Sequence, residues 1–402
     1  MQSTETKPRD LRRLSTIEEG LSGYDFSQPF QHYAKQHFRQ YPQMGSTDRR
    51  VFKAVAYSLY SIGKALQNES FGVRCSVGSF LRETELCAFT EFLLGEFTPL
   101  PAESISLHPK EKIKIIQQFF PSFSLEDVFP WRKNLSKEID ADDFILSFFT
   151  KPFIWIRVQE KFREKVLTEL QQHDFIYMED KVVKNAISFE KNYDLIKLKS
   201  FESGYFEIQD RSSQECSTLM HPADGESWWD CCCGSGGKSL LLNSLANNLN
   251  IFATDIRNSM FEQLKVRFNR NKIRNYSIAV WDLEKPIDME GKKKDSDGIL
   301  LDAPCTGSGT WTASPEIIQT FDPALIQINH QKQIAIAQNV LPYLKVGKPL
   351  IYITCSVFKE ENEKVVEVLC KKHGLELESS KYFKGYSNRA ATLFGARMVK
   401  KS

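Results

Sequence analysis

Several features are scarce in this 402-residue chain, and each absence narrows what the protein can be. No run approaches the roughly 18 to 20 apolar residues that a membrane span needs. The N-terminal segment MQSTETKPRDLRR lacks the apolar core of a secretory signal. The formal net charge is only +2, so a nucleic-acid partner would have to be met by local basic patches. We therefore expect a cytoplasmic protein without a membrane partner.

The nine cysteines form no C-x-x-C pair, and their number is odd. The nearest approach is the contiguous run Cys231-Cys232-Cys233, and adjacent residues rarely point at one metal ion. A disulfide framework is equally poorly supported in a reducing cytosol. We expect free thiols and no metal site, which leaves single cysteines as candidates for chemistry or for core packing.

The chain is long for one domain, and its pattern divides it into three parts. The first, residues 1–130, is predicted to be helical. Ser46 or Thr47 is placed to cap a helix whose apolar residues recur at helical spacing. The pair Arg49-Arg50 near its start could contact phosphate, although the sequence alone favours a solvated basic turn.

The second part, residues 131–212, changes to short strands around one helix. This order favours a small open α+β sheet of the ferredoxin or RNA-recognition type, a fold that often displays RNA-binding side chains. We expect strands at 152–158, 175–177, 186–189 and 205–208, with a helix at 159–173.

The third part, residues 213–402, alternates strands and helices. Such alternation predicts a mostly parallel, doubly wound Rossmann-like sheet, with ligands at the carboxyl ends of its strands. The expected strands are 227–230, 251–255, 277–281, 298–302 and 349–354, and the expected helices are 238–248, 261–269 and 323–344.

The first of these strands runs into the glycine-rich loop DCCCGSGGKS. Its glycines allow a sharp turn and a close approach to a ligand. Gly237-Lys238-Ser239 fits the end of a P-loop, but Cys232 stands where that motif needs its first glycine. An NTPase is therefore a distant alternative. Asp255 and Asp282 end the next two strands, and acids there suit the ribose hydroxyls and adenine amino group of S-adenosylmethionine.

Two cysteines follow two further strands, in LLDAPCTGSG and YITCSVF. Cys305 and Cys355 should thus lie at the ligand edge of one sheet. A thiolate that adds to C6 of cytosine makes C5 nucleophilic enough to accept a methyl group. Asp302 could serve as the acid at N3, and a base must later remove the C5 proton. Strand ends alone do not decide which cysteine attacks.

The stretches DAPCTGSGTW, YITCSVFKEENE and DCCCGSGGKS resemble the signature motifs of the RNA cytosine-C5 methyltransferase family, the Fmu/RsmB type and its eukaryotic relatives. Residues 201–213 resemble that family's entry into the catalytic domain, and residues 394–400 resemble its last strand. Upstream, residues 149–157 resemble the start of a small α+β domain, and residues 46–50 an all-helical NusB-like domain. The resemblance implies a class I S-adenosylmethionine-dependent methyltransferase domain, residues 213–402, preceded by two RNA-binding domains.

Matched motif by motif, the resemblance implies that Cys355 is the nucleophile and that Cys305 assists product release, beside Asp302 as the candidate N3 acid or orienting residue. The implied cofactor contacts are Cys232, Cys233, Gly234, Ser235, Gly236, Gly237, Lys238, Asp255, Asp282 and Asp302.

Two departures from the family pattern affect the loop and the RNA. Cys233-Gly234-Ser235 replaces the usual A-A-P, and Thr312-Ala313 stands where relatives commonly carry arginines. The resemblance implies 16S ribosomal RNA as the substrate. A transfer-RNA substrate and a catalytically weak RNA-binding or ribosome-assembly factor are the alternatives, and we expect a monomer.

Overall fold

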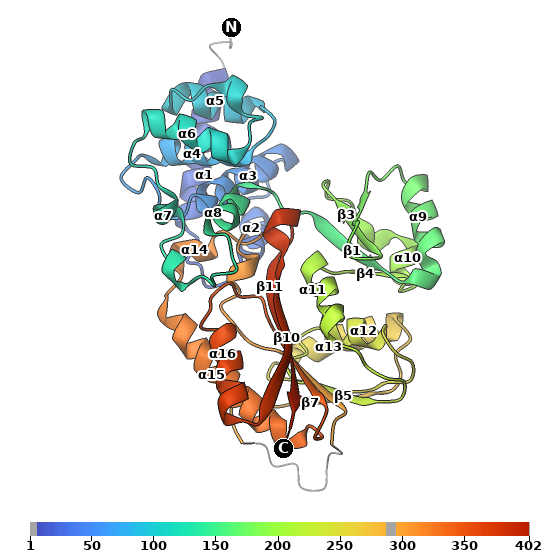
Figure 1. Cartoon of the computed structure of the whole chain (residues 1–402). Coiled ribbons are helices and arrows are strands. Elements are labelled where there is room, and N and C mark those ends of the chain that lie inside the picture. Colours follow the sequence, from blue (N-terminus) through green and yellow to red (C-terminus); the bar gives the residue numbers. More distant parts are fainter. Residues whose placement is uncertain (1–5, 287–294, 402) are drawn as a thin grey trace. The chain divides into compact units, whose positions relative to one another are not determined.

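The computed structural model describes residues 6–286 and 295–401, which divide into two compact units (Figure 1). The helical unit comprises the chain up to residue 133 together with 140–151 and 311–322. The sheet unit comprises 134–139, 152–310 and 323 to the C-terminus. The sequence boundaries proposed at residues 130 and 212 stay predictions. Within the described ranges, no helix combines the length and apolarity needed to cross a membrane.

The helical unit packs short amphipathic helices around an aromatic core. Its helix α3, Ser46–Ser61, begins directly after Gly45, and no side chain caps it. The predicted cap at Ser46 or Thr47 is therefore wrong, because both residues already lie inside the first turn. The other helices are α1 (Thr6–Ser22), α2 (Phe30–Gln40), α4 (Phe71–Arg82), α5 (Ala88–Phe97), α6 (Pro109–Phe119), α7 (Leu125–Val128), α8 (Ala141–Leu146) and α14 (Ile317–Thr320).

Residues 311–322 belong to this helical unit, whereas the residues on either side of them in the sequence belong to the sheet unit. The Trp311 ring is fully buried, 4.7 Å from the ring of Phe321 and 5.8 Å from that of Trp131. The buried Glu316 carboxylate accepts a hydrogen bond from the backbone N–H of Phe30, the first residue of α2. A helix N-terminus favours such a negative charge. The chain thus leaves the sheet unit after Thr310 and returns to it at Pro323.

The sheet unit is organised around a seven-stranded sheet with the order β10-β11-β9-β8-β5-β6-β7. The pairs from β9 to β7 are parallel, whereas β11 pairs antiparallel with both β9 and β10. The order reverses between β5 and β8, which is where doubly wound sheets bind ligands. The strands are β5 (Ser227–Asp230), β6 (Asn250–Asp255), β7 (Tyr276–Val280), β8 (Gly298–Asp302), β9 (Pro349–Thr354), β10 (Leu375–Lys384) and β11 (Thr392–Lys400).

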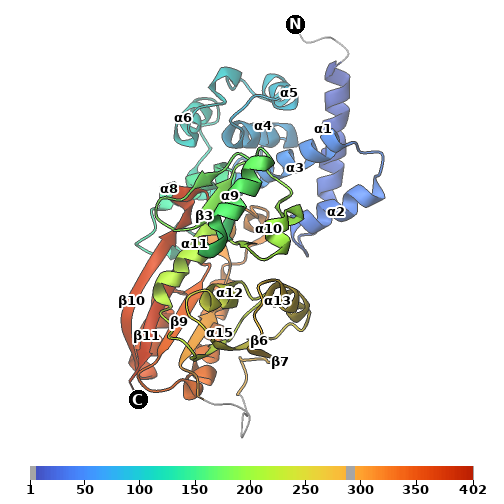
Figure 2. The same cartoon turned by 90° about the vertical axis from the view of Figure 1, so that its right-hand side faces the viewer.

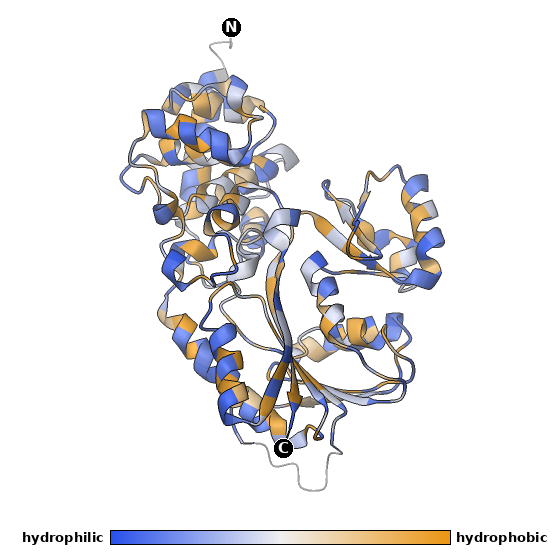
Figure 3. Ribbon diagram, in the orientation of Figure 1, coloured by the Kyte–Doolittle hydropathy of each residue, from blue (hydrophilic) through white to orange (hydrophobic). Residues whose placement is uncertain are grey.

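Helices cover both faces of this sheet (Figures 1 and 2). Helices α12 and α13 lie on one face, and α15 and α16 lie on the other. The helices alternate hydrophilic and hydrophobic residues (Figure 3), and the buried side chains of α13 are Phe261, Leu264 and Phe268. Their bounds are α12 (Gly237–Asn243), α13 (Ser259–Arg270), α15 (Ala324–Val340) and α16 (Glu363–Lys372), with the short α11 (Arg211–Glu215) before β5.

A second, four-stranded antiparallel sheet has the order β2-β3-β1-β4. One face packs on its own helix α9 through buried residues such as Val166 and Leu170. On the other face, Trp155 donates to the backbone oxygen of Arg389, and Arg157 is buried. Both faces of this sheet are therefore covered, whereas the sequence predicted a sheet with an open face. Its elements are β1 (Ile154–Val158), α9 (Arg163–Gln172), β2 (Met178–Glu179), β3 (Ala186–Phe189), α10 (Lys199–Glu202) and β4 (Phe206–Ile208).

Candidate functional site

The glycine-rich loop joins β5 to α12 through two residues with left-handed backbone. Gly234 has φ of 51° and Gly236 has φ of 81°. A Cβ atom at Gly236 would lie 2.9 Å from the Phe268 ring, so both the conformation and the close packing require glycine there. The predicted strand–turn–helix around this loop is confirmed, although α12 ends at Asn243 rather than at residue 248.

Asp230 fixes the start of this loop. Its side chain is fully buried, and its Oδ2 accepts a hydrogen bond of 2.5 Å from the Ser239 hydroxyl on α12. Burial raises the pKa of Asp230 to about 7, which the Ser239 hydrogen bond opposes only in part. The residue therefore ties strand to helix and does not face a ligand.

A cavity of about 440 Å³ lies at the carboxyl ends of four parallel strands, β5 to β8. Carboxylates occur along its wall, interrupted by apolar side chains and two basic ones. The lining residues are Cys231, Cys232, Asp255, Ile256, Arg257, Trp281, Asp282, Leu283, Glu284, Asp302, Pro304, Lys332 and Ile336. The structure thus brings Cys232, Asp255, Asp282 and Asp302 together, as the strand ends predicted.

Asp255 is the most constrained acid of this cavity. Its Oδ2 accepts the backbone N–H of Gly234 at 2.9 Å, and its Oδ1 accepts the backbone N–H of Arg257 at 2.9 Å and its Nε at 3.0 Å. Burial favours a higher pKa, but the hydrogen bonds from Arg257 and Gly234 outweigh it and lower the pKa of Asp255. This acid is a fixed anion with the glycine loop bound to it.

The other predicted loop residues contribute less directly. The Cys233 side chain is buried in the core of the sheet unit, so only its backbone lies at the site. Asp282 pairs with Lys285 at 2.8 Å, and that hydrogen bond lowers the pKa of Asp282. Gly234, Ser235 and Gly236 form the turn itself, and Gly237 begins α12.

Lys238 and Asp302 form an ion pair between the loop and the fourth strand end. Nζ of Lys238 lies 2.8 Å from Oδ2 of Asp302, and the lysine is largely buried. Burial alone would lower the pKa of Lys238, but the adjacent Asp302 carboxylate raises it overall. The ammonium of Lys238 therefore pairs with a carboxylate of the cavity. In a P-loop, the lysine at this position would instead contact the nucleotide phosphates.

Cys305 and Cys355 lie side by side at the end of the sheet. Their sulfur atoms are 3.4 Å apart, and both residues are half-buried. The contact with the Cys355 sulfur, and then burial, raise the pKa of Cys305. Pro304, the neighbour of Cys305, lines the cavity described above, so the thiol pair adjoins it.

Glu361 links the loops that carry the two cysteines, and the sequence did not single it out. It is fully buried; Oε1 accepts the backbone N–H of Thr306 at 2.8 Å, and Oε2 accepts the hydroxyls of Thr306 at 2.6 Å and of Ser356 at 2.5 Å. Burial raises the pKa of Glu361 against these hydrogen bonds. Because Thr306 follows Cys305 and Ser356 follows Cys355, one carboxylate holds both loops.

Arg257 and Trp281 are further site residues that sequence reasoning missed. Arg257 lies two residues after the acid it binds, and Trp281 immediately precedes Asp282. The sequence signal that could have identified Arg257 and Trp281 is their position beside an acid that follows a strand. In the described ranges, no group of three or more histidine, cysteine or acidic side chains is placed to hold a metal ion.

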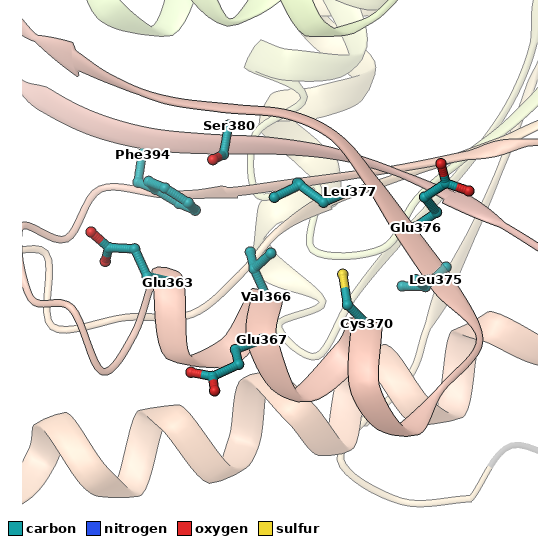
Figure 4. Close-up of a pocket in the computed structure, with 9 residues that line it drawn as sticks. All are labelled: Glu363, Val366, Glu367, Cys370, Leu375, Glu376, Leu377, Ser380 and Phe394. Atoms are coloured by element: carbon teal, nitrogen blue, oxygen red, sulfur yellow. The ribbon is translucent and has the colours of Figure 1, made fainter.

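A second cavity, of about 460 Å³, lies between α16 and β10 and contains none of the predicted site residues (Figure 4). Apolar side chains such as Val366 and Leu377 form much of its wall. Cys370 supplies a thiol, and burial raises the pKa of that thiol. The arrangement offers no acid–base pair or cofactor loop comparable to that at the strand ends.

Comparison with known proteins places these features in context. Residues 217–395 match the model of the family described as 16S rRNA methyltransferase RsmB/F. Ribosomal RNA small subunit methyltransferase B of Proteus mirabilis is 32% identical over 218 residues, which cover 54% of this chain and 51% of that protein. The protein of the same name from Yersinia pestis is 29% identical over 67% of this chain and 59% of its own length. The chain thus spans about half to six-tenths of these two relatives.

Solved structures share the fold. The structure titled PH0851 matches with a TM-score of 0.70 and 22% identity, covering 98% of this chain and 99% of its own. The structure of NSun6 from Pyrococcus horikoshii with SFG matches with a TM-score of 0.59 and 18% identity, covering 68% and 97%. At these identities the likeness establishes a common fold.

Proposed function

We propose that this chain methylates C5 of cytosine in RNA, with S-adenosylmethionine as methyl donor, because residues 217–395 match the model of the 16S rRNA methyltransferase RsmB/F family. One observation carries the proposal: the Cys305–Cys355 pair, with sulfurs 3.4 Å apart, adjoins a cavity built from strand-end acids. Covalent activation of a pyrimidine needs a thiol beside the methyl donor. Neither an NTPase nor a pure RNA-binding factor needs that pair.

The cavity fits S-adenosylmethionine by its chemistry. Asp255 and Asp282 are acceptors for ribose hydroxyls and an adenine amino group, and Ile256, Trp281 and Leu283 provide apolar walls for a flat ring. The family to which residues 217–395 belong uses this cofactor. When bound, S-adenosylmethionine supplies the methyl group.

Cys355 is the proposed nucleophile. Its thiolate adds to C6 of cytosine, and the electron pair of the C5–C6 double bond then becomes available at C5. Cys305 suits the role of assisting product release, because its sulfur lies 3.4 Å from that of Cys355. After methyl transfer, Cys305 in its thiolate form is the proposed base that takes the C5 proton; the C5–C6 double bond then re-forms and the Cys355 thiolate leaves.

The ion pair of Lys238 and Asp302 is the proposed contact with the cytosine ring. Addition of a thiolate to C6 places negative charge toward N3, and a hydrogen-bonded ammonium and carboxylate can share a proton with that atom. The ion pair refines the role expected for Asp302 alone. The lysine, whose pKa the carboxylate raises, provides the proton that Asp302 by itself would lack.

Small-subunit ribosomal RNA is the proposed substrate, on the strength of the relatives' names. We also propose that the helical unit is NusB-like and binds RNA. Exposed basic side chains on α2 and α3, including Lys35, Arg39 and Arg50, support this contact with phosphate. Arg49 instead donates to the backbone oxygen of Met44 at 2.8 Å, which favours a structural role.

The small sheet is proposed to be a ferredoxin-like domain. The antiparallel order β2-β3-β1-β4 with a helix after β1 supports a ferredoxin-like domain. Because both its faces are covered, we propose that any RNA contact uses its exposed lysine-bearing helices and loops, such as Lys161 and Lys165. A cytoplasmic location is consistent with the nine free cysteines.

Mapping of 5-methylcytosine in cellular RNA, with and without the protein, tests the reaction and the substrate together. We expect loss of one methylated cytosine in small-subunit ribosomal RNA. A lost site in transfer RNA would replace the substrate, and no lost site in any RNA would reject the methyltransferase.

Substitution of the cysteines tests the assigned roles. Cys355→Ala should abolish methyl transfer without an adduct, whereas Cys305→Ala should accumulate a covalent protein–RNA adduct, visible on a denaturing gel. Cys370→Ala, which removes a half-buried thiol on α16, is the matched control and should retain activity. Adduct accumulation in Cys355→Ala would reverse the two assignments.

A further inference from the structure

Ser235 lies in the middle of the glycine-rich loop between β5 and α12. It stands between Gly234 and Gly236, both of which have left-handed backbone. Glycines of this kind give the chain many alternative conformations, so the loop keeps one of them only if outside contacts select it. A serine, unlike a proline, imposes no backbone angle of its own.

Arg267 on α13 supplies such contacts. Its Nη1 donates to the Ser235 side-chain oxygen at 2.9 Å and to the Ser235 backbone oxygen at 3.2 Å. A Cβ atom on Gly237 would come within 3.6 Å of the same nitrogen, so the guanidinium also lies beside the first residue of α12. Two directed hydrogen bonds from one planar group define both the side chain and the backbone of Ser235.

Glu207 fixes the guanidinium in turn. This carboxylate, on strand β4 of the small sheet, is buried, and its Oε2 accepts from Arg267 Nε at 3.1 Å and Nη2 at 3.0 Å. Its other oxygen accepts from Arg270 at 2.5 Å and from Asn271 at 2.6 Å. With four donors around one carboxylate, Arg267 has little freedom to turn away from the loop.

We propose that Arg267 is a positioning residue for the cofactor: held by Glu207, it fixes Ser235 and thereby the loop that bounds the cofactor cavity. The proposal rests on the function proposed above. Cys232 lines the cavity three residues before Ser235, and the Gly234 N–H holds the Asp255 carboxylate. A loop loosened at Ser235 would therefore shift both a wall of the cavity and its best-fixed acid.

A purely structural ion pair between α13 and β4 is the competing explanation, and Arg270 separates the two. Both arginines lie on α13 and both bind Glu207, but only Arg267 has hydrogen bonds to Ser235. Arg267→Lys and Arg270→Lys each keep the charge and weaken a Glu207 contact. The first also removes the fork that binds the loop.

Calorimetric titration with S-adenosylmethionine provides the first measurement. We expect Kd to rise about tenfold in Arg267→Lys and to change by less than about twofold in Arg270→Lys. Ser235→Ala, which keeps the backbone acceptor, should raise Kd about threefold. Added to Arg267→Lys it should have no further effect, because the contact is already absent. Equal Kd values for the two lysine variants, or additive effects in the double variant, would overturn the proposal.

Hydrogen exchange of residues 231–238 in the ligand-free protein provides a second measurement that does not depend on the cofactor. Arg267→Lys should speed exchange across the loop, and Arg270→Lys should leave it as in the wild type. Unchanged exchange in Arg267→Lys would refute the positioning role. A wild-type protein that binds no S-adenosylmethionine would instead refute the proposed function, and the exchange data would still decide on the loop.

Discussion

Replacement of Glu361 by glutamine asks whether one buried carboxylate keeps the two cysteines in reacting distance. In the wild type, Oε1 accepts the backbone N–H of Thr306 and the side-chain amide of Gln333, and Oε2 accepts two hydroxyls, from Thr306 and Ser356. Glutamine keeps one oxygen and replaces the other by a donor. The hydroxyls can turn to accept, whereas the Thr306 N–H cannot, so the amide nitrogen should face Thr306 Oγ1 and Ser356 Oγ.

The cost in stability should be moderate. Charge-assisted hydrogen bonds are worth about 1.5–3 kcal/mol and neutral ones about 0.5–1.5 kcal/mol. Loss of the charge from these hydrogen bonds is partly offset because a buried charge no longer has to be desolvated, and the same burial raises the pKa of Glu361. We therefore expect the free energy of unfolding to fall by about 1–2 kcal/mol.

The effect on methyl transfer should be larger than this loss of stability implies. A displacement of about 1 Å between reacting groups lowers a rate roughly 100-fold, and Glu361 directly joins the residues that follow Cys305 and Cys355. We expect the single-turnover rate of Glu361→Gln to fall about 10- to 100-fold at a temperature where the variant is fully folded.

Single-turnover methylation, with urea unfolding measured in parallel, is the assay. Glu363→Gln is the matched control, because Glu363 hydrogen-bonds Tyr382 at 3.0 Å and also Ser136, but neither cysteine loop. It should lose stability and keep its rate. A wild-type rate in Glu361→Gln, or an equal loss in both variants, would refute the positioning argument.

One prediction concerns the interior of the sheet unit, and another concerns that of the helical unit. Asp230 has its pKa raised to about 7 by burial, so its contribution to stability is full below the unfolded value of about 3.9 and is lost as pH rises through about 7. Relative to Asp230→Asn, the wild-type free energy of unfolding should therefore fall by about 2 kcal/mol between pH 5 and pH 7, and parallel urea-unfolding profiles for the two proteins would contradict this. Trp311→Ala should destabilise the helical unit by about 3–5 kcal/mol, because the buried ring contacts Trp131 and Phe321; a loss below about 1 kcal/mol in circular-dichroism melting would show that residues 311–322 are dispensable to its core.

The strand ends of the large sheet were predictable because geometry leaves little choice there. Parallel strands that alternate with helices present their carboxyl ends at one edge, so residues at those ends meet however distant they are in sequence. Asp255 and Asp302 therefore came together in one cavity as expected. Three of the predicted strands, 227–230, 298–302 and 349–354, match β5, β8 and β9 residue for residue. Strand β10 was not predicted, because it pairs with β11 and its outer residues are mostly exposed.

Contacts between segments far apart in sequence were the part that local pattern could not supply. Nothing in the run from Trp311 to Glu316 indicates that it belongs to a helical core, because its partners Trp131 and Phe30 lie some 180 to 286 residues away. The second face of the small sheet was similarly hidden. Alternation identified its strands, but their covering by Arg389 comes from tertiary packing.

The positions of Cys305 and Cys355 after strand ends could not identify the sulfur that reacts. Cys305 and Cys355 follow neighbouring strands and lie equally exposed, so the sequence pattern treats them alike. What brings them together is tertiary structure, which places the two sulfurs 3.4 Å apart. Thiols this close titrate as a pair, so their protonation does not by itself assign the nucleophile. Motif resemblance gives that role to Cys355, and an adduct that accumulates in the Cys305→Ala variant and not in Cys355→Ala would be its direct chemical consequence.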